Sequence, residues 1–220
     1  LTILLMWVIT GCSQNTKQSG KDKKEKSVSS SVAAEAGTDD EDAGFKLYGI
    51  KSGIIEYKFS GSRTGTSTMY FDRYGKRSAT YSNLTMNKEN GKSWTLNLDN
   101  MQYFWKEGST QGMKMKNQML DELIKINDIE KFAEETYEKI GLKPAGTETF
   151  QGKECRVFKG NMGKVLIWKG ILMLSDMNIM GTTSRQELTK IEVNIPIKSS
   201  VFEIPKGVNF LDLPGFGNSE

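Results

Sequence analysis

Residues 53–59 read GIIEYKF, in which apolar side chains recur at every second position. This alternation is typical of a β-strand with one buried face, because successive side chains of a strand point to opposite sides of the sheet. The stretch 94–98, WTLNL, repeats it with Trp, Leu and Leu on one side. The turn pairs Tyr74-Gly75 and Asn90-Gly91 lie between them, and the second is a strong hairpin signal. This half of the chain predicts an antiparallel meander.

The second half of the chain shows the same pattern of strands and turns. Gln151-Gly152 precedes an apolar run at 155–158, and Lys169-Gly170 separates runs at 165–168 and 171–174. A longer strand is predicted from about 183 to 195, with polar residues on one side. One face of this second meander is therefore expected to face solvent.

Helical spacing is confined to the middle of the chain. Leu120, Leu123 and Ile124 form one apolar stripe, and Ile129, Phe132, Ala133, Tyr137 and Ile140 form a second one. Asn127 with Glu130 is typical of a helix start, and Gly141 followed by Pro144 is typical of a helix end. The predicted fold class is α+β, mostly antiparallel β: an open, curved sheet (a half-barrel) covered by a mid-chain helix pair.

The N-terminal part of the chain has a different composition. Residues 1–11, LTILLMWVITG, are an apolar run too short for a membrane span and typical of a signal peptide. The junction 9–12 resembles a bacterial lipobox, which implies a fatty-acylated, palmitate-type anchor on Cys12. An apolar strand or buried helix with a core cysteine is the alternative. The lysine-rich stretch that follows at once argues against packing there.

The chain is therefore divided into a signal peptide (1–11), a lipidated Cys12 with a disordered tether (12–44), and one folded domain (45–220). Residues 13–44 contain almost no large apolar side chain, so burial cannot offset the entropy of ordering them. The domain carries a small positive net charge, too diffuse to indicate a nucleic-acid partner.

The domain resembles the periplasmic lipoprotein-carrier superfamily, the LolA-like and LolB-like proteins. The resemblance rests on GIKSGIIEY at 49–57, the mid-chain helices, the GKEC strand entry at 152–155, the WKGI hairpin at 168–171 and FEIP at 202–205. It implies an apolar cavity that receives acyl chains or related amphiphiles. The cavity candidates are Met86, Trp94, Met101, Met119, Trp168, Met173 and Met177. The alternative for the methionines is ordinary filling of a β-rich core.

The composition argues against an enzyme. The chain has no histidine, which removes the commonest general base and zinc ligand. Cys155 is left without a cysteine partner if Cys12 is lipidated, and we expect it to be a buried structural thiol. The acidic pairs of the helical region are adjacent in sequence and point in different directions. No catalytic residue, metal site or cofactor is predicted.

Together these features predict a non-enzymatic, membrane-anchored envelope lipoprotein that faces the periplasm, with the outer membrane favoured. Its predicted partners are the membrane, through Cys12, and a lipidic or other amphiphilic ligand. The alternative is a protein-interaction module that docks an envelope protein through the sheet face or a sheet edge.

Overall fold

The computed structural model describes residues 46–118, 120, 123, 125 and 129–213. Most of this chain is β-structure, and the described strands form a single twelve-stranded sheet. The strands are β1 Gly53–Gly61, β2 Arg63–Asp72, β3 Arg77–Met86, β4 Glu89–Leu98, β5 Met101–Lys106, β6 Gln111–Lys116, β7 Lys143–Phe150, β8 Lys153–Gly160, β9 Gly163–Trp168, β10 Ile171–Ile179, β11 Thr182–Val193 and β12 Asn209–Asp212. The prediction of two β halves around a helical region is confirmed.

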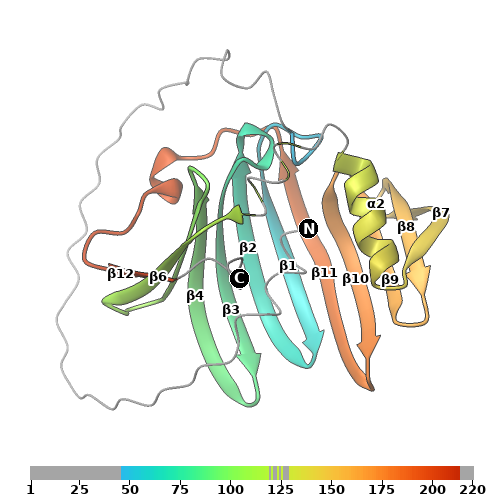
Figure 1. Cartoon of the computed structure of the whole chain (residues 1–220), viewed down its shortest axis with the longest axis horizontal. Helices are drawn as coiled ribbons and strands as arrows, with labels where there is room; N and C mark the ends of the chain where they lie inside the picture. Colours follow the sequence, from blue (N-terminus) through green and yellow to red (C-terminus); the bar gives the residue numbers. More distant parts are fainter. Residues whose placement is uncertain (1–45, 119, 121–122, 124, 126–128, 214–220) are drawn as a thin grey trace, which may run out of the picture. The chain divides into compact units, whose positions relative to one another are not determined.

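The sheet is open, with β12 and β7 at its two edges (Figure 1). Its order is β12-β6-β5-β4-β3-β2-β1-β11-β10-β9-β8-β7. Every neighbouring pair is antiparallel except β12 and β6, which run parallel. The central pairing of β1 with β11 joins the two predicted meanders, so that the strand at 53–59 lies in the middle of the sheet.

Tight two-residue turns connect many of these strands. Asn87 and Lys88, between β3 and β4, have φ values of 51° and 69°. Gln151-Gly152 and Lys169-Gly170 also have positive φ at both positions, as a type I′ hairpin turn requires. These two predicted turns are confirmed. The predicted turn at Asn90-Gly91 is wrong, because Met86 pairs with Glu89 and the Asn-Gly pair continues β4.

The two faces of the sheet follow from its register, because directly opposite residues on neighbouring strands share a face. Phe59 lies opposite Gln186, which lies opposite Ser175, and the same row continues through Val165 to Phe158. The helix packs on this row, as described below. We call this side, which carries Ile55, Tyr57 and Phe59, the inner face, and the other side the outer face.

The sheet curves strongly near its β7 edge. Nε2 of Gln151, in the β7–β8 turn, donates a hydrogen bond to the carbonyl of Leu188 in β11. In a flat sheet these strands would be roughly 14 Å apart, because β9 and β10 separate them and neighbouring strands lie about 4.8 Å apart. A single glutamine side chain cannot bridge that distance. The predicted curvature of the sheet is therefore confirmed.

Helix α2, Ile129–Lys139, packs on the inner face at the β7–β8 end of the sheet (Figure 1). Its buried Tyr137 packs on Phe158, with 4.7 Å between the ring centroids. Arg156 of β8 pairs with Glu134 of the helix at 2.7 Å and with Glu130 at 3.4 Å. The helix ends at Lys139, and Gly141 in the turn that follows has a φ of 77°, which suits glycine, as the sequence predicted.

The predicted covering helix pair is not confirmed. Among the described residues, α2 is the one α-helix with defined bounds. Much of the stretch predicted for the other helix, including Ile124, and the predicted start at Asn127, lie outside the described residues. Leu120 and Leu123, which are described, are both buried.

The C-terminal segment packs on the outer face. The 3-10 turn η4, Ser199–Phe202, places Phe202 against Ala79 and Leu96, and all three side chains are buried. Beyond it β12 joins β6 at the edge of the sheet. The 3-10 turn η3, Arg73–Gly75, links β2 to β3. The segment before β1 is bound to this turn, because the amide of Tyr48 donates a hydrogen bond to the carbonyl of Tyr74.

Candidate functional site

The inner face differs in character on the two sides of β1. Toward the helix, Tyr57 lies opposite Leu188, and the next row ends on the buried Val165 and Phe158. Away from the helix, Tyr57 lies opposite Ser67, followed along the same row by Ser82 and Ser93. In the row of Tyr57, an apolar side chain therefore lies on the helix side, whereas short hydroxyl side chains follow on the other side.

More buried polar side chains continue this second half of the inner face. Asn97 Nδ2 donates to the hydroxyl of Ser78 at 3.1 Å, and Asn97 Oδ1 accepts from Gln102 at 3.0 Å. Thr95 is buried one row further along β4. Buried polar groups are normally hydrogen-bonded, as this network is. The short side chains give this part of the inner face a buried polar surface.

Two polar groups at one end of the inner face have no hydrogen-bond partner. The first residue of β2, Arg63, lies over the ring of Phe59, with 4.5 Å from its Cζ to the ring centroid. Its Nε atom is buried without an acceptor. Gln186, opposite Phe59 and only 4% exposed, has a buried Oε1 without a donor. A donor and an acceptor therefore flank one aromatic ring, both unsatisfied.

Burial acts on the charge of Arg63. It lowers the pKa of the guanidinium from its usual value, and no carboxylate counteracts this. An arginine remains protonated at neutral pH even so, because its unperturbed pKa exceeds 12. The inner face therefore carries a partly buried positive charge next to apolar surface.

Sequence reasoning did not single out Arg63 or Gln186. A signal was present, because Arg63 shares its alternation with Met69 and Phe71 in the run RTGTSTMYF and so had to face the apolar side. The face of Gln186 was also signalled, because it alternates with Leu188, but its place opposite Phe59 depends on a β-bulge in the β1–β11 pairing.

The predicted cavity candidates separate in the structure. Met86 lies opposite Arg63 and is 37% exposed, and the half-buried Met177 lies opposite Ser184, which borders Gln186 on the inner face. Met173 is fully buried at a bulge in β10. Met119 lies outside the described residues.

The other three candidates are not neighbours of these methionines. Trp94 lies opposite Trp105, with the two rings stacked at 6.1 Å, and belongs with Leu98 to the outer-face cluster. Met101 lies opposite Leu98 on the same face. Trp168 ends β9, where the ammonium of Lys153 lies 4.8 Å from its ring. The sequence could not separate them, because face assignment across a sheet requires the register.

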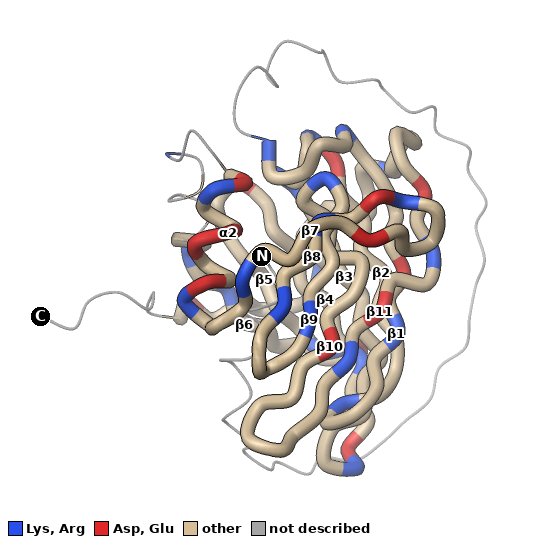
Figure 2. Tube along the Cα trace, turned by 90° about the vertical axis from the view of Figure 1, so that its right-hand side faces the viewer, with Lys and Arg blue, Asp and Glu red and all other residues tan. Residues whose placement is uncertain are grey.

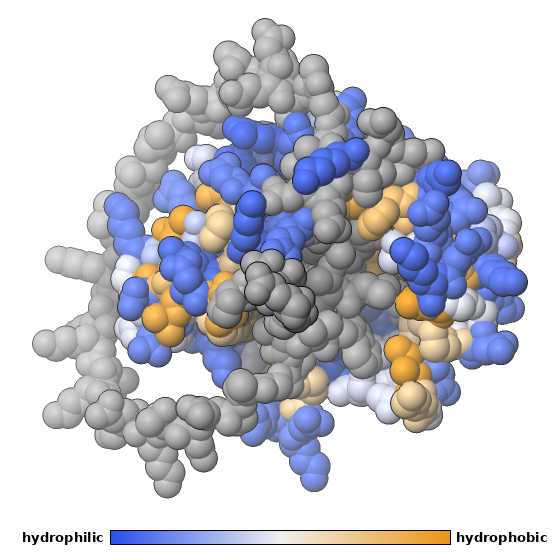
Figure 3. Space-filling model, in the orientation of Figure 1, coloured by the Kyte–Doolittle hydropathy of each residue, from blue (hydrophilic) through white to orange (hydrophobic). Residues whose placement is uncertain are grey.

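An aromatic cluster occupies the outer face near β12. It consists of Tyr81, Trp94, Trp105, Tyr103 and Phe210. The rings of Trp105 and Phe210 meet edge to face at 5.9 Å, so the C-terminal strand covers one side of the cluster. In the view of Figure 3, apolar residues appear in separate patches bordered by polar ones.

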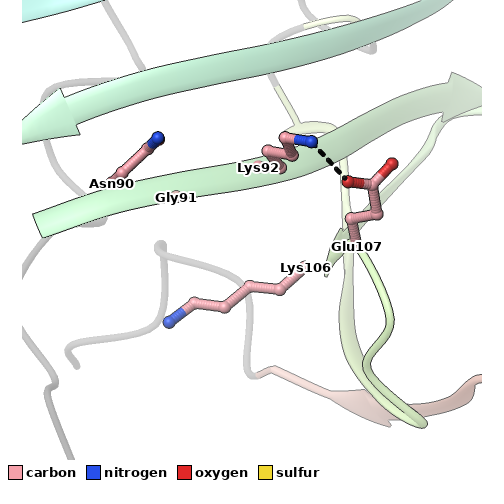
Figure 4. Close-up of a pocket in the computed structure, with 5 residues that line it drawn as sticks. All are labelled: Asn90, Gly91, Lys92, Lys106 and Glu107. Carbon is pink, nitrogen blue, oxygen red and sulfur yellow. Dashed lines mark ion pairs between the residues drawn. The ribbon is translucent and has the colours of Figure 1, made fainter. Parts of the chain in front are cut away.

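Two surface pockets are found in the described part of the chain. One, of about 410 Å³, is lined by Asn90, Gly91, Lys92, Lys106 and Glu107 (Figure 4). Lys92 and Glu107 form an ion pair across it at 3.5 Å, whereas Lys106 points away. The other, of about 460 Å³, lies beyond the end of α2 and includes Gly141, Lys159 and Met162. None of the predicted cavity candidates lines either pocket.

Cys155 is a buried free thiol, as the sequence predicted. Burial raises the pKa of this thiol, which disfavours the reactive thiolate. The described part of the chain brings no group of three or more Cys, Asp or Glu side chains together in a way that could hold a metal ion. In the same residues no helix is both long and apolar enough to span a bilayer. Cys12 and the tether lie outside the described residues.

No protein-family model and no curated protein matches the sequence. A solved structure of an uncharacterized conserved protein from Thermus thermophilus is similar, with a TM-score of 0.51 and 6% identity over 74% of this chain and 91% of that one. Weaker likenesses include the MucA/MucB complex of Pseudomonas aeruginosa, with a TM-score of 0.43 and 10% identity over 74% of this chain and 58% of that one. LprF from Mycobacterium bovis has a TM-score of 0.35 and 10% identity over 74% of this chain and 92% of that one. At these identities the first likeness concerns the fold alone, and the weaker two support no conclusion about this chain.

Proposed function

We propose that this protein is a non-enzymatic envelope lipoprotein, anchored through Cys12, whose inner sheet face binds an amphiphilic or lipidic ligand. The observation that carries the proposal is the difference between the two halves of the inner face. Toward α2, Tyr57 is followed by Leu188 and the next row ends on Val165 and Phe158, whereas serines from three successive strands continue the row of Tyr57 on the other side. Ligand sites combine apolar surface with a few placed polar groups, and this face offers both.

A protein-docking module is the second candidate. The edge strand β7 is exposed along nearly its whole length and has β8 as its one strand neighbour, so it could accept a further strand. Pro144 and the irregular register between Pro144 and Thr147 interrupt this edge, and such features normally block strand addition. The edge therefore gives weaker support than the inner face.

The anchor can be tested by intact-mass measurement of the protein from an envelope extract. We expect a mature chain that begins at Cys12 and carries fatty-acyl mass, and we expect Cys12→Ser to abolish both processing and acylation. An unprocessed, unmodified wild-type chain in the envelope would contradict this part of the proposal.

The ligand site can be tested by filling it. Ser67→Phe places a ring beside Tyr57 on the inner face, whereas Thr66→Phe places the same ring on the exposed outer face one residue away. We expect Ser67→Phe to weaken the binding of a dansyl-labelled fatty acid by about tenfold or more, equivalent to at least 1.4 kcal/mol. Thr66→Phe should leave it within about twofold, or roughly 0.4 kcal/mol.

Thermal unfolding of both variants controls for misfolding. Equal probe binding by the wild type and by a Ser67→Phe variant of unchanged melting temperature would refute an inner-face site. Native mass spectrometry of the protein, purified without delipidation, would in addition identify a ligand that co-purifies. No probe uptake and no co-purifying species would favour the docking module.

A further inference from the structure

Arg63 is exceptional among the arginines of the described residues. Arg77 pairs with Asp72, Arg156 with two glutamates of α2, and Arg185 with Asp176 and Glu187. Arg73 has no such pair but is exposed on η3. Arg63 alone is partly buried without a carboxylate, and its Nε is sealed from solvent without an acceptor. An uncompensated buried charge is costly, so it calls for a functional explanation.

In the described part of the chain, the strands next to Arg63 present no anion to it on the inner face; Glu89 of β4 lies further along the same row, beyond Met86, and is exposed. Met86 lies directly opposite Arg63 on β3, and Gly65 lies opposite both Phe59 and Leu84. On this face β1, β2, β3 and β11 present Gly, Ile, Tyr, Phe, Ser, Thr, Met, Leu, Val and Gln beside Arg63, and neither Asp nor Glu. The acidic residues of β1 and β11, Glu56, Glu187 and Glu192, are on the outer face.

Gln186 supplies the complementary half of a head-group site. It lies on the other side of Phe59 from Arg63, and its buried Oε1 needs a hydrogen-bond donor. A ligand that satisfies both groups must present an anion to the guanidinium and a hydroxyl or amide N–H to the glutamine. Phe59, Met69 and Leu84 give an apolar surface beside them for a hydrocarbon chain.

We propose that Arg63 and Gln186 form the head-group subsite of this protein and select an anionic lipid whose head also carries a hydroxyl, such as a phosphatidylglycerol-type lipid. This inference rests on the proposed amphiphile-binding function and names its ligand class. The phosphate binds the guanidinium, the head-group hydroxyl donates to Gln186 Oε1, and the acyl chain lies along the inner face beside Tyr57. Arg63 is thus a specificity-determining residue.

The test compares two probes of equal acyl chain, lysophosphatidylglycerol and lysophosphatidylcholine, each below its critical micelle concentration. Binding is measured by displacement of the dansyl-labelled fatty acid from the full chain carrying Cys12→Ser. We expect the wild type to favour the anionic lipid by about tenfold or more, because a charge-assisted hydrogen bond has that effect. Arg63→Met should abolish the preference while leaving the affinity for lysophosphatidylcholine within about twofold.

Matched variants separate charge from fold. Arg63→Lys should keep part of the preference, since it retains the charge but not the planar fork. Arg185→Met, which removes a paired arginine from the outer face, should leave the preference for the anionic lipid unchanged. Gln186→Met should weaken the binding of lysophosphatidylglycerol but not the binding of an alkyl phosphate, which lacks the head-group hydroxyl.

The outcomes are distinguishable. If the wild type binds neither lipid, the proposed function fails and this inference fails with it. If the wild type binds both lipids equally, or Arg63→Met retains the wild-type preference, the head-group subsite alone is refuted and a general apolar site remains.

Discussion

The two faces of the central strands β1, β2 and β11 differ in how their charged side chains are paired. On the outer face, Lys190 contacts Glu192 and Glu56, and Arg185 contacts Asp176 and Glu187. Figure 2 shows acidic and basic segments close together along these strands. On the inner face Arg63 stands without a carboxylate. The arginine and the two glutamates of β11 on the outer face are paired within the protein, whereas Arg63 on the inner face is not.

This difference in charge pairing suits two surfaces with different roles. Exposed ion pairs contribute little to stability, typically below about 1 kcal/mol, but they keep an exposed β-surface polar and specific. An unpaired, partly buried arginine reduces stability, and proteins retain such features mostly where they act on a ligand. The outer face is therefore consistent with a solvated surface, and the inner face with a binding surface.

The largest expected effect concerns packing on the inner face. Leu188 is fully buried opposite Tyr57, so Leu188→Ala should lower the free energy of unfolding by about 2–5 kcal/mol through lost burial and a residual cavity. Lys58→Ala, on the exposed outer side of β1, should change it by less than about 0.5 kcal/mol. Urea denaturation measures both. Similar losses in the two variants would mean that the faces are assigned wrongly.

The next effect is a loss of stability at alkaline pH. Burial raises the pKa of Tyr137 from 10.0 to about 12, so the folded state holds this proton where the unfolded chain has released it. Stability is fully present below pH 10 and falls as pH rises toward 12, by about 2–3 kcal/mol from this residue.

Tyr137→Phe isolates this contribution, because it keeps the ring on Phe158 and removes the titrating hydroxyl. Burial also raises the pKa of Tyr57 well above its usual value, so a smaller decline should remain in the variant. Denaturation between pH 9 and 12 measures the difference. An unchanged alkaline decline in Tyr137→Phe would exclude Tyr137 as a source.

A smaller effect on stability is expected from removing ion pairs, and it should be larger for a buried pair than for an exposed one. Arg77 is bound to Asp72 through two hydrogen bonds and lies 4.3 Å from the ring centroid of Phe202, with both charged side chains mostly buried. Arg77→Met should cost about 1–2 kcal/mol. Arg185→Met, on the more exposed outer face, should cost less than about 1 kcal/mol. An equal cost in the two variants would show that the C-terminal segment gains nothing from Arg77.

The smallest effect has the opposite sign. Arg63→Met removes an unpaired charge and keeps an apolar chain over Phe59, so it should raise the free energy of unfolding by about 0.5 kcal/mol. Thermal unfolding without added lipid measures this change. A loss of stability comparable with that of Arg77→Met would indicate that Arg63 has a structural role.

Sequence alternation determined much of the fold on its own. The run at 53–59 became β1, the stretch at 94–98 became the second half of β4, and Gln151-Gly152 and Lys169-Gly170 became turns. These features are local, because the strand period and the φ preference of glycine act within a few residues. The end of the helix at Lys139, just before Gly141, is local for the same reason.

Only the tertiary structure decided which residues meet. Trp94 and Met177 both looked like cavity residues, yet the register places Trp94 beneath the C-terminal segment on the outer face and Met177 on the inner one. The bulge between Glu56 and Tyr57 fixes Gln186 opposite Phe59. Such pairings are non-local: a shift of one residue exchanges the two faces of a strand, and packing of the whole sheet selects the register. The candidate site, built around Arg63 and Gln186, depends entirely on that choice.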